Sequence, residues 1–210
     1  MIRHVILDLD DTLYSVKSGL DSFFVKRLGE FASSWLGLSW EEFEPLRDGV
    51  LKRYGTTLEW LVAEKGFTAV DDYFAYVHPE NEADSLVPDP KLRSFLEGLP
   101  CRCSVLTNSP FFHADRIIKK LGLDGVFEKV FAVESHGLGF RGKPHASAYY
   151  LALDALGLKP EHVLFVDDSP RYVKGFIDLG GIGLLLDEND NHKNFPYGRI
   201  KNLQELAQFL

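Results

Sequence analysis

Hydrophobic and polar positions give the first part of the chain two different patterns. A continuous apolar run at 5–7 predicts a buried strand. From residue 14 to about 88, apolar residues recur at three- and four-residue spacing, which predicts helices throughout that stretch. Ser39 with Glu42 forms a capping box that opens one of these helices, and Gly66 ends the next one. The first strand is therefore followed by a helical segment.

After residue 88 the pattern changes to short apolar runs that alternate with helical segments. This alternation predicts right-handed crossovers and a parallel sheet with helices on both faces. We expect an α/β protein with a Rossmann-like, doubly wound core made of residues 1–13 and 89–210. Residues 14–88 are expected to form an α-helical domain inserted after the first strand. The later strands are predicted at 104–106, 130–133, 163–166 and 182–186.

Composition supports one such core with a small second lobe. The chain has 210 residues, of which 45% are hydrophobic. No apolar run reaches the roughly 18 residues of a membrane span, and the first strand follows Met1 too closely to leave room for a signal peptide. Cys101 and Cys103 are expected to be reduced core residues rather than a metal pair. The sequence therefore predicts a soluble cytoplasmic protein.

The charge balance bears on the class of partner. The formal net charge is −8. Residues 14–88 carry seven Lys or Arg against thirteen Asp or Glu, so most of the acidic excess lies in the helical segment. An acidic surface repels polyanions. We expect neither a nucleic acid nor a membrane surface as a partner.

Polar residues follow three of the predicted strands at their carboxyl ends. In a doubly wound sheet, ligands bind at this edge. Asp8 and Asp10 are two positions apart on extended chain, so both side chains should point into one site. A lysine that precedes a predicted helix adds a positive charge. The full set is Asp8, Asp10, Thr107, Asn108, Lys143, Asp167 and Asp168.

Several carboxylates that meet in one crevice require a hard cation. An all-oxygen set with few protein ligands favours Mg²⁺. The seven histidines contain no H-x-H, H-x-x-x-H or H-E-x-x-H pattern, so a zinc site has little support. The glycine-rich signatures of common ATP- and dinucleotide-binding sites are also absent from the sequence.

Four motifs in order resemble the signature of the haloacid dehalogenase-like (HAD) superfamily. They are Asp8-x-Asp10-x-Thr12, Thr107 after an apolar strand, Lys143-Pro144, and Asp167-Asp168 after another apolar strand. Their spacing fits along the whole chain, and the helical insert lies where that superfamily places its C1-type cap. Each motif alone is weak, but four in the correct order form a strong pattern.

The resemblance implies a role for each matched residue. Asp8 would attack phosphorus and form an aspartyl-phosphate. Asp10 would protonate the leaving oxygen and later deprotonate the hydrolytic water. Thr107 and the backbone amide of Asn108 would hold the phosphoryl oxygens, and Lys143 would neutralise charge on the phosphate and the nucleophile.

The resemblance also implies a magnesium site and a reaction class. Asp8, the carbonyl of Asp10, and Asp167 would bind Mg²⁺, with Asp168 behind them or acting through a water molecule. In the dehalogenases of the superfamily the second acid is missing and no metal is needed. The presence of Asp10 therefore favours a phosphatase.

A narrower resemblance points to the pyrimidine 5′-nucleotidase branch. It rests on stretches in the core and in the insert, such as Tyr54-Gly55-Thr56-Thr57 and Lys143-Pro144-His145. It implies a small phosphorylated metabolite as substrate, with pyrimidine nucleoside 5′-monophosphates first, and a monomer or homodimer. Other small metabolites remain alternatives, namely a sugar phosphate, phosphoglycolate or pyridoxal phosphate. Phosphomutase, 2-haloacid dehalogenase and a non-catalytic binding protein are further rivals.

A few residues outside the four motifs are open to two interpretations. Tyr14 lies where the chain leaves the first strand, so it either lines the site or serves as a hinge. Tyr54 and Thr56 are candidates for substrate contact from the cap, although Thr56 is equally a helix N-cap. His113 and Arg116 lie one helical turn apart, and they either cover the mouth of the site or form a solvated helix face.

Overall fold

A six-stranded parallel sheet organises the computed structural model, which describes residues 1–133 and 140–210. The strand order is β3-β2-β1-β4-β5-β6, and every neighbouring pair is parallel. The strands are β1 (His4–Leu7), β2 (Arg102–Leu106), β3 (Val130–Phe131), β4 (Val163–Asp167), β5 (Ile182–Leu186) and β6 (Gly198–Ile200). The predicted α/β fold with a doubly wound parallel sheet is confirmed.

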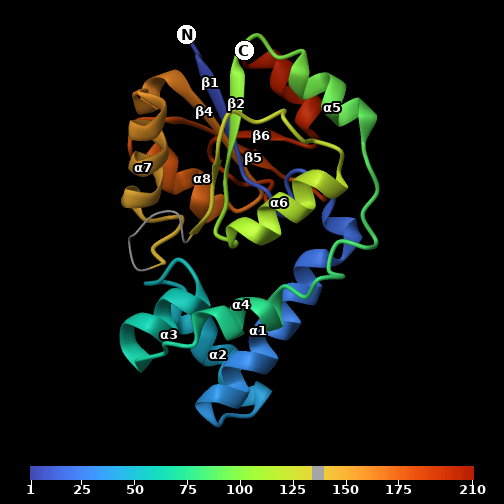
Figure 1. Cartoon of the computed structure of the whole chain (residues 1–210). Coiled ribbons are helices and arrows are strands. Elements are labelled where there is room, and N and C mark those ends of the chain that lie inside the picture. The colour runs from blue at the N-terminus through green and yellow to red at the C-terminus, as the bar shows by residue number, and fades with distance from the viewer. Residues whose placement is uncertain (134–139) are drawn as a thin grey trace.

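Helices cover both faces of the sheet (Figure 1). One face carries α7 (Ala146–Leu156) and α8 (Pro170–Ile177), and the other carries α5 (Pro90–Glu97) and α6 (Phe111–Lys120). Successive side chains of β1 point to opposite faces of the sheet, which explains the two layers of helices. Ile6 packs into the cluster that contains residues of α7 and α8, whereas Val5 and Leu7 pack into the cluster that contains residues of α5 and α6. Short 3₁₀ helices complete the core at Pro160–His162 and Leu203–Gln208.

The segment between β1 and α5 forms a lobe of four helices, seen below the sheet in Figure 1. These are α1 (Leu20–Leu36), α2 (Trp40–Val50), α3 (Thr57–Lys65) and α4 (Val70–Val77). The capping box predicted at Ser39 and Glu42 is present, and Gly66 ends α3 in the left-handed conformation. Phe43, Trp60 and Phe67 are buried inside the lobe, and they belong to the same apolar cluster as the core residues packed under α5 and α6. Helix α1 contacts both α2 and α4.

Three expectations about the elements need correction. Strand β3 covers only Val130–Phe131 of the strand predicted at 130–133. The first helix of the lobe begins at Leu20 rather than near residue 14, because a short 3₁₀ helix at Val16–Ser18 precedes it and Gly19 has a positive φ of 74°. Strand β6 was not predicted. Its three residues include a glycine and an arginine, so it has no apolar pattern, and it is recognised only by its pairing with β5.

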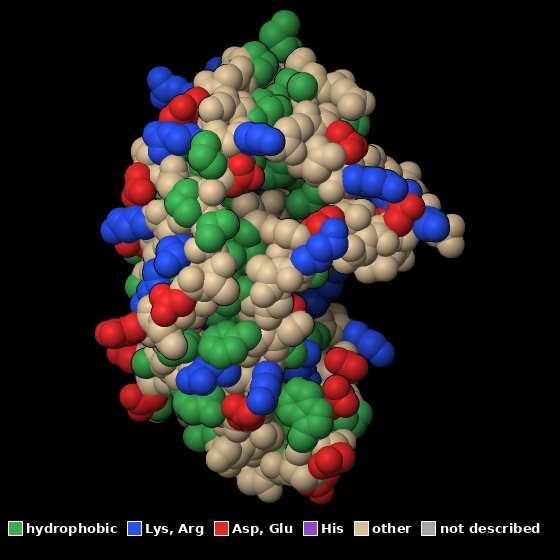
Figure 2. Space-filling view, turned by 90° about the vertical axis from the view of Figure 1, so that its right-hand side faces the viewer, with side chains coloured by type: hydrophobic (Ala, Val, Ile, Leu, Met, Phe, Trp, Pro, Cys, Tyr) green, Lys and Arg blue, Asp and Glu red, His purple; other side chains and the backbone are tan. Residues whose placement is uncertain are grey.

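Acidic and basic side chains are interspersed over the face of the molecule seen in Figure 2. On that face, neither Lys and Arg nor Asp and Glu gather into one continuous patch. Within the part of the chain that the structure describes, no helix combines the length and the apolar character that crossing a membrane would require.

Candidate active site

Three predicted site residues meet at one edge of the sheet because their strands are neighbours. Strand β1 lies between β2 and β4, and Leu7 is in register with Val105 on one side and Val166 on the other. Asp8, which follows β1, therefore lies between the ends of β2 and β4, where Thr107 and Asp167 are found. The parallel arrangement brings these side chains together, although Thr107 and Asp167 lie 99 and 159 residues from Asp8 along the chain.

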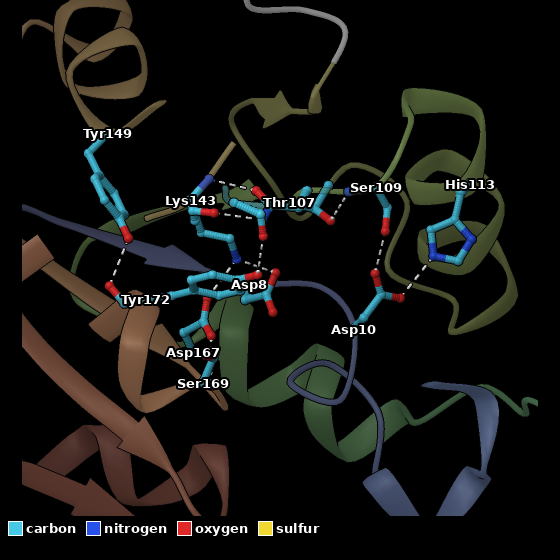
Figure 3. A network of polar contacts seen from close by, with 12 residues as sticks. Asp8, Asp10, Thr107, Ser109, His113, Lys143, Tyr149, Asp167, Ser169 and Tyr172 are labelled. Carbon is cyan, nitrogen blue, oxygen red and sulfur yellow. Dashed lines mark hydrogen bonds and ion pairs between the residues drawn. The ribbon is translucent and has the colours of Figure 1, made fainter. Parts of the chain in front are cut away.

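Lys143 connects two of the carboxylates. Its Nζ lies 2.6 Å from Asp8 Oδ1 and 2.6 Å from Asp167 Oδ2, and its side chain is only 1% exposed (Figure 3). Burial alone would lower the pKa of Lys143, but the charges of Asp167 and Asp8 raise it above its usual range. The lysine is therefore positively charged, and it lies beside the ring of Tyr172, 5.1 Å from the ring centroid.

The side chain of Asn108 holds Lys143 in place. Asn108 Oδ1 accepts a hydrogen bond from the Lys143 amide at 2.7 Å, and Nδ2 donates to the Lys143 carbonyl at 3.0 Å. Gly142 allows this close approach, because a Cβ there would lie 2.1 Å from Asn108 Oδ1. Sequence reasoning considered only the backbone amide of Asn108. The contact between its side chain and the lysine has no signature in the sequence, since it joins residues 35 positions apart.

Thr107 is almost completely buried below these groups. Its hydroxyl oxygen accepts a hydrogen bond from the Ser109 amide at 3.0 Å. This contact orients the turn that follows β2, and it leaves the hydroxyl hydrogen free to donate to an incoming anion.

Asp168 joins Asp8 and Asp167 in a group whose carboxylate oxygens lie within 4.8 Å of one another. Burial, followed by the charges of Asp167 and Asp8, raises the pKa of Asp168 to about 9. Burial also raises the pKa of Asp8, even though Lys143 opposes that shift. A buried group with more carboxylates than its lysine neutralises suits a divalent cation, and oxygen ligands favour Mg²⁺. The residues therefore fit the expected metal.

The expected ligands included Asp8, the Asp10 carbonyl and Asp167, with Asp168 in a supporting position. Among the described residues, the group of carboxylates close enough to share an ion contains Asp168 and not the side chain of Asp10. Asp168 is thus placed more directly at this group than the sequence suggested.

The carboxylate of Asp10 lies to one side of the cluster, in a pocket of hydrogen-bond donors (Figure 3). Oδ1 accepts from the Tyr14 hydroxyl at 2.7 Å and lies 2.8 Å from His113 Nε2, while Oδ2 accepts from the Ser109 hydroxyl at 2.7 Å. Burial alone would raise the pKa of Asp10, but the charge of His113 and these hydrogen bonds lower it well below its usual range. Tyr14 therefore contacts a predicted catalytic residue.

His113 is the main residue of the site whose role was not predicted. Its side chain is 0% exposed, so the solvated helix face considered for it is wrong. Its second ring nitrogen, Nδ1, lies 2.9 Å from Glu82 Oε2. Burial alone would lower the pKa of His113, but Asp10 and Glu82 raise it to about 9. A single histidine on a helix gives no sign in the sequence of the carboxylates that it will meet.

The lobe contacts the core beside this site. Arg171 donates to the Tyr54 carbonyl at 2.7 Å, and His145 lies 2.9 Å from Glu59 of α3. The Tyr54 side chain turns away, and its hydroxyl donates to Glu64 at 2.6 Å. Thr56 caps α3 through the Glu59 amide at 3.1 Å. Thr56 thus combines the two interpretations given to it, because it also lines the cavity described next.

A cavity of about 190 Å³ lies between the lobe and the core. Its core side includes Asp10, Asn108 and Ser109, and its lobe side is mainly apolar. Arg47 contributes a positive charge, and its Nε donates to Thr57 Oγ1 at 3.2 Å. The apolar lobe residues that line the cavity include Phe24, Val25, Leu28, Leu51, Tyr73, Phe74 and Val77.

Comparison with known proteins identifies the family of the chain. Residues 2–180 match the family model of the haloacid dehalogenase-like hydrolases. The chain belongs to this family. It is 27% identical over 176 residues to a phosphoglycolate phosphatase of Pasteurella multocida, covering 79% of this chain and 73% of that protein. The predictions of a HAD-like protein and a hydrolase are thus confirmed.

Solved structures show the same fold. A magnesium-bound HAD hydrolase of Bacillus subtilis superposes with a TM-score of 0.64 at 18% identity, covering 100% of this chain and 98% of that one. The L-2-haloacid dehalogenase of Xanthobacter autotrophicus superposes with a TM-score of 0.62 at 17% identity, covering 99% of each chain. Phosphatases and dehalogenases are both similar to this chain, so the choice between the two reactions depends on the residues of the site.

Proposed function

We propose that the protein is a Mg²⁺-dependent phosphomonoesterase that forms a phosphorylated intermediate on Asp8. The observation that carries this proposal is the placement of Asp10, whose carboxylate has three donors around it and lies beside the cavity. Release of an alcohol from a phosphate ester needs a proton at the leaving oxygen, whereas release of a halide does not. A well-held second carboxylate therefore supports phosphoester hydrolysis over dehalogenation.

The first step transfers the phosphoryl group. A carboxylate oxygen of Asp8 forms a bond to phosphorus as the bond to the leaving oxygen breaks. Asp10 takes up a proton when the phosphate dianion lies beside it, and it donates that proton to the leaving oxygen. Lys143 stays charged within 2.6 Å of Asp8 and offsets negative charge that gathers at the reacting group. Thr107 donates its hydroxyl hydrogen to a phosphoryl oxygen, together with the backbone amide of Asn108.

The second step regenerates the enzyme. A water molecule loses a proton to Asp10 and forms a bond to phosphorus, while the bond between phosphorus and Asp8 breaks. The products of the two steps are one alcohol and inorganic phosphate, and Asp10 is protonated again. The same carboxyl group thus acts as the acid in one step and as the base in the next.

Asp8, Asp167 and Asp168, with the Asp10 carbonyl, are the groups that would hold Mg²⁺. When bound, the ion supplies positive charge that orients the phosphate and offsets repulsion between it and the carboxylates. Without that charge the pKa of Asp8 is raised by burial and by its acidic neighbours, so the cation also favours the ionised nucleophile.

We further propose that residues 14–88 are a C1-type cap and that residues 1–13 and 89–210 are the catalytic core. The contacts of Arg171 with Tyr54 and of His145 with Glu59 support a cap that closes on the site. The cavity between the two parts would receive the leaving group. With a volume of about 190 Å³, it suits a small metabolite, since pockets for drug-sized ligands span about 300–1,000 Å³.

The substrate proposed first remains a nucleoside 5′-monophosphate, with pyrimidine nucleotides preferred, and the aromatic side chains of the cavity support a planar base. Phosphoglycolate is a second candidate, because Arg47 in the cavity could bind its carboxylate and because the Pasteurella relative is a phosphoglycolate phosphatase. A panel of phosphomonoesters compared by kcat/KM decides between them. Preference for phosphoglycolate or a sugar phosphate over UMP and CMP would overturn the nucleotidase assignment alone.

The mechanism is tested with Asp8→Asn and a control at the neighbouring Asp11. We expect Asp8→Asn to abolish Mg²⁺-dependent hydrolysis of p-nitrophenyl phosphate and to prevent labelling by beryllofluoride, which mimics an aspartyl-phosphate. Asp11 has a φ of 51°, a conformation that asparagine tolerates well, so Asp11→Asn should remain folded and active. Turnover by folded Asp8→Asn at the wild-type rate would refute the nucleophile assignment.

A further inference from the structure

A chain of buried polar side chains leads away from Asp10 toward the lobe. His113 Nε2 lies 2.8 Å from Asp10 Oδ1, and His113 Nδ1 lies 2.9 Å from Glu82 Oε2. The second contact is an ion pair rather than an aligned hydrogen bond. Glu82, whose side chain is 0% exposed, also contacts Arg116 and lies 2.9 Å from His78 Nδ1.

These residues come from different parts of the fold. His113 and Arg116 lie one turn apart on α6, which belongs to the helices packed on the sheet. Glu82 lies in the segment that returns from α4 to α5, and His78 directly follows α4. Arg116 also donates to the Pro79 carbonyl at 3.1 Å, so α6 holds this returning segment at two points.

We propose that His113 and Glu82 are positioning residues for Asp10, the acid and base of the proposed reaction. This inference rests on the phosphomonoesterase function proposed above. His113 faces a carboxylate at each ring nitrogen, and an ionised carboxylate only accepts hydrogen bonds. A doubly protonated ring satisfies both partners. Glu82 thereby fixes the ring, and the ring fixes the carboxylate of Asp10.

The positioning role has a direct chemical consequence. Proton transfer requires the Asp10 carboxyl group to lie within hydrogen-bond distance of the leaving oxygen. Without His113 the carboxylate keeps only the hydroxyl contacts of Tyr14 at Oδ1 and Ser109 at Oδ2, so its rotation about the last bond is less restricted and the oxygen that carries the proton is less well fixed. Tyr14 and Ser109 also contact Asp10, but among these three contacts His113 is the one that also faces a second carboxylate, that of Glu82.

The same side chains raise a second possibility. Ligand atoms of His78, Glu82 and His113 lie within 4.8 Å of one another, which would suit a metal ion. Arg116 argues against it, because its guanidinium contacts Glu82 and would repel a divalent cation. Both histidines also lie 2.9 Å from one and the same oxygen of Glu82, a distance typical of charge-assisted hydrogen bonds and ion pairs. We therefore assign the cluster to contacts around Glu82: a hydrogen bond with His78, whose pKa burial lowers, and ion pairs with His113 and Arg116.

Two amide variants of His113 separate a positioning role from a structural one. In His113→Gln the amide nitrogen can take the place of Nε2 and donate to Asp10. In His113→Asn it can take the place of Nδ1, which keeps a polar group toward Glu82 and leaves Asp10 Oδ1 without this donor. His4→Asn serves as a matched control, since His4 is another buried histidine, 3% exposed, that contacts Ser104 rather than the site.

The measured quantity is the rate of the first turnover, with two substrates that differ in their leaving group. p-Nitrophenyl phosphate releases an anion that is stable without a proton, whereas an alkyl phosphate depends on the acid. General acid–base catalysis contributes about 10²–10⁴-fold in rate. We expect His113→Asn to slow release of the alcohol by about tenfold or more and release of p-nitrophenolate by less than about threefold. His113→Gln should restore most of the rate, and His4→Asn should match the wild type.

Different results would refute the positioning role of His113 and the phosphomonoesterase function. Equal losses with both substrates, or no loss in His113→Asn, would overturn the positioning role. If His113→Asn does not fold, Glu82→Gln replaces it in the test. We expect Glu82→Gln to slow release of the alcohol more than release of p-nitrophenolate, by a smaller factor than His113→Asn. Wild-type protein that hydrolyses neither substrate in Mg²⁺ would refute the phosphomonoesterase function and, with it, this inference. Loss of activity on adding a strong zinc chelator while excess Mg²⁺ is present would instead support a metal at Glu82.

Discussion

Replacing Lys143 by methionine tests whether the carboxylates at the sheet edge depend on one buried cation. The lysine contacts Asp8 and Asp167 at 2.6 Å each, and its side chain is 1% exposed. Methionine has a similar length without the charge, so it fills most of the space. Lys143→Met therefore removes the charge and leaves the carboxylates buried, and we expect loss of both activity and stability.

The expected loss of stability is large because the pair is buried. Removing one partner of a buried ion pair costs about 3–5 kcal/mol, since the remaining charge stays without compensation. This is a large fraction of the roughly 5–15 kcal/mol that stabilises a typical domain. Lys174→Met is the control, because Lys174 pairs with Asp178 four residues on and its side chain is 57% exposed. An exposed pair of this kind is screened by solvent and contributes little to stability.

Urea unfolding at pH 7 with and without Mg²⁺ measures both effects. We expect Lys143→Met to lose several-fold more free energy of unfolding than Lys174→Met in the absence of the ion. An ion present at about 100 times its dissociation constant adds about 2.7 kcal/mol to the free energy of unfolding. Mg²⁺ should therefore restore part of the stability. A free energy of unfolding for Lys143→Met within about 1 kcal/mol of that of the control would contradict the reasoning.

Two further predictions concern groups that support the site. Gly142→Ala places a Cβ 2.1 Å from Asn108 Oδ1, so it should lower stability by about 1–3 kcal/mol and reduce kcat, whereas Gly49→Ala, with open space, should be neutral or stabilising in urea unfolding. Burial alone would raise the pKa of Glu82, but its contacts with His113 and His78 lower it to about 2. The ionised Glu82 carboxylate therefore stabilises the fold above pH 4.5, and this contribution to the free energy of unfolding is lost as pH falls through 2. The stability difference between wild type and Glu82→Gln should shrink over that range.

Parts of the fold and the site that depend on local pattern could be predicted from the sequence. The parallel topology places Asp8 beside Thr107 and Asp167, because strand ends in a parallel sheet share an edge. The expectation that Asp10 points into the same group was wrong, because the chain turns after β1 and the Asp10 carboxylate lies to one side. The end of α3 was predicted because glycine is favoured after the last turn of a helix, and Gly66 ends it with a positive φ. In each case a residue within a few positions, or a general rule of topology, determines the result.

Contacts between distant side chains could not be predicted in this way. His113 meets Glu82 across 31 positions and Asp10 across 103, and no spacing rule joins residues so far apart. The side-chain contact of Asn108 with Lys143 and the pairing of β6 with β5 were not predicted for the same reason. The assignment of His113 to either a site mouth or a solvated face used only the neighbours on its own helix, and the deciding partners lie on other segments.

Asp8 and Asp10 have opposite environments although they are two residues apart. Burial with acidic neighbours raises the pKa of Asp8, while donors and a charged histidine lower that of Asp10. Without metal and substrate these two shifts run opposite to the proposed roles, since a general acid needs a raised pKa and a nucleophile an ionised carboxylate. A divalent cation would favour ionised Asp8, and the dianionic phosphate of the substrate would raise the pKa of Asp10. Binding of metal and substrate would thus move each carboxyl group toward the protonation state that its proposed step requires.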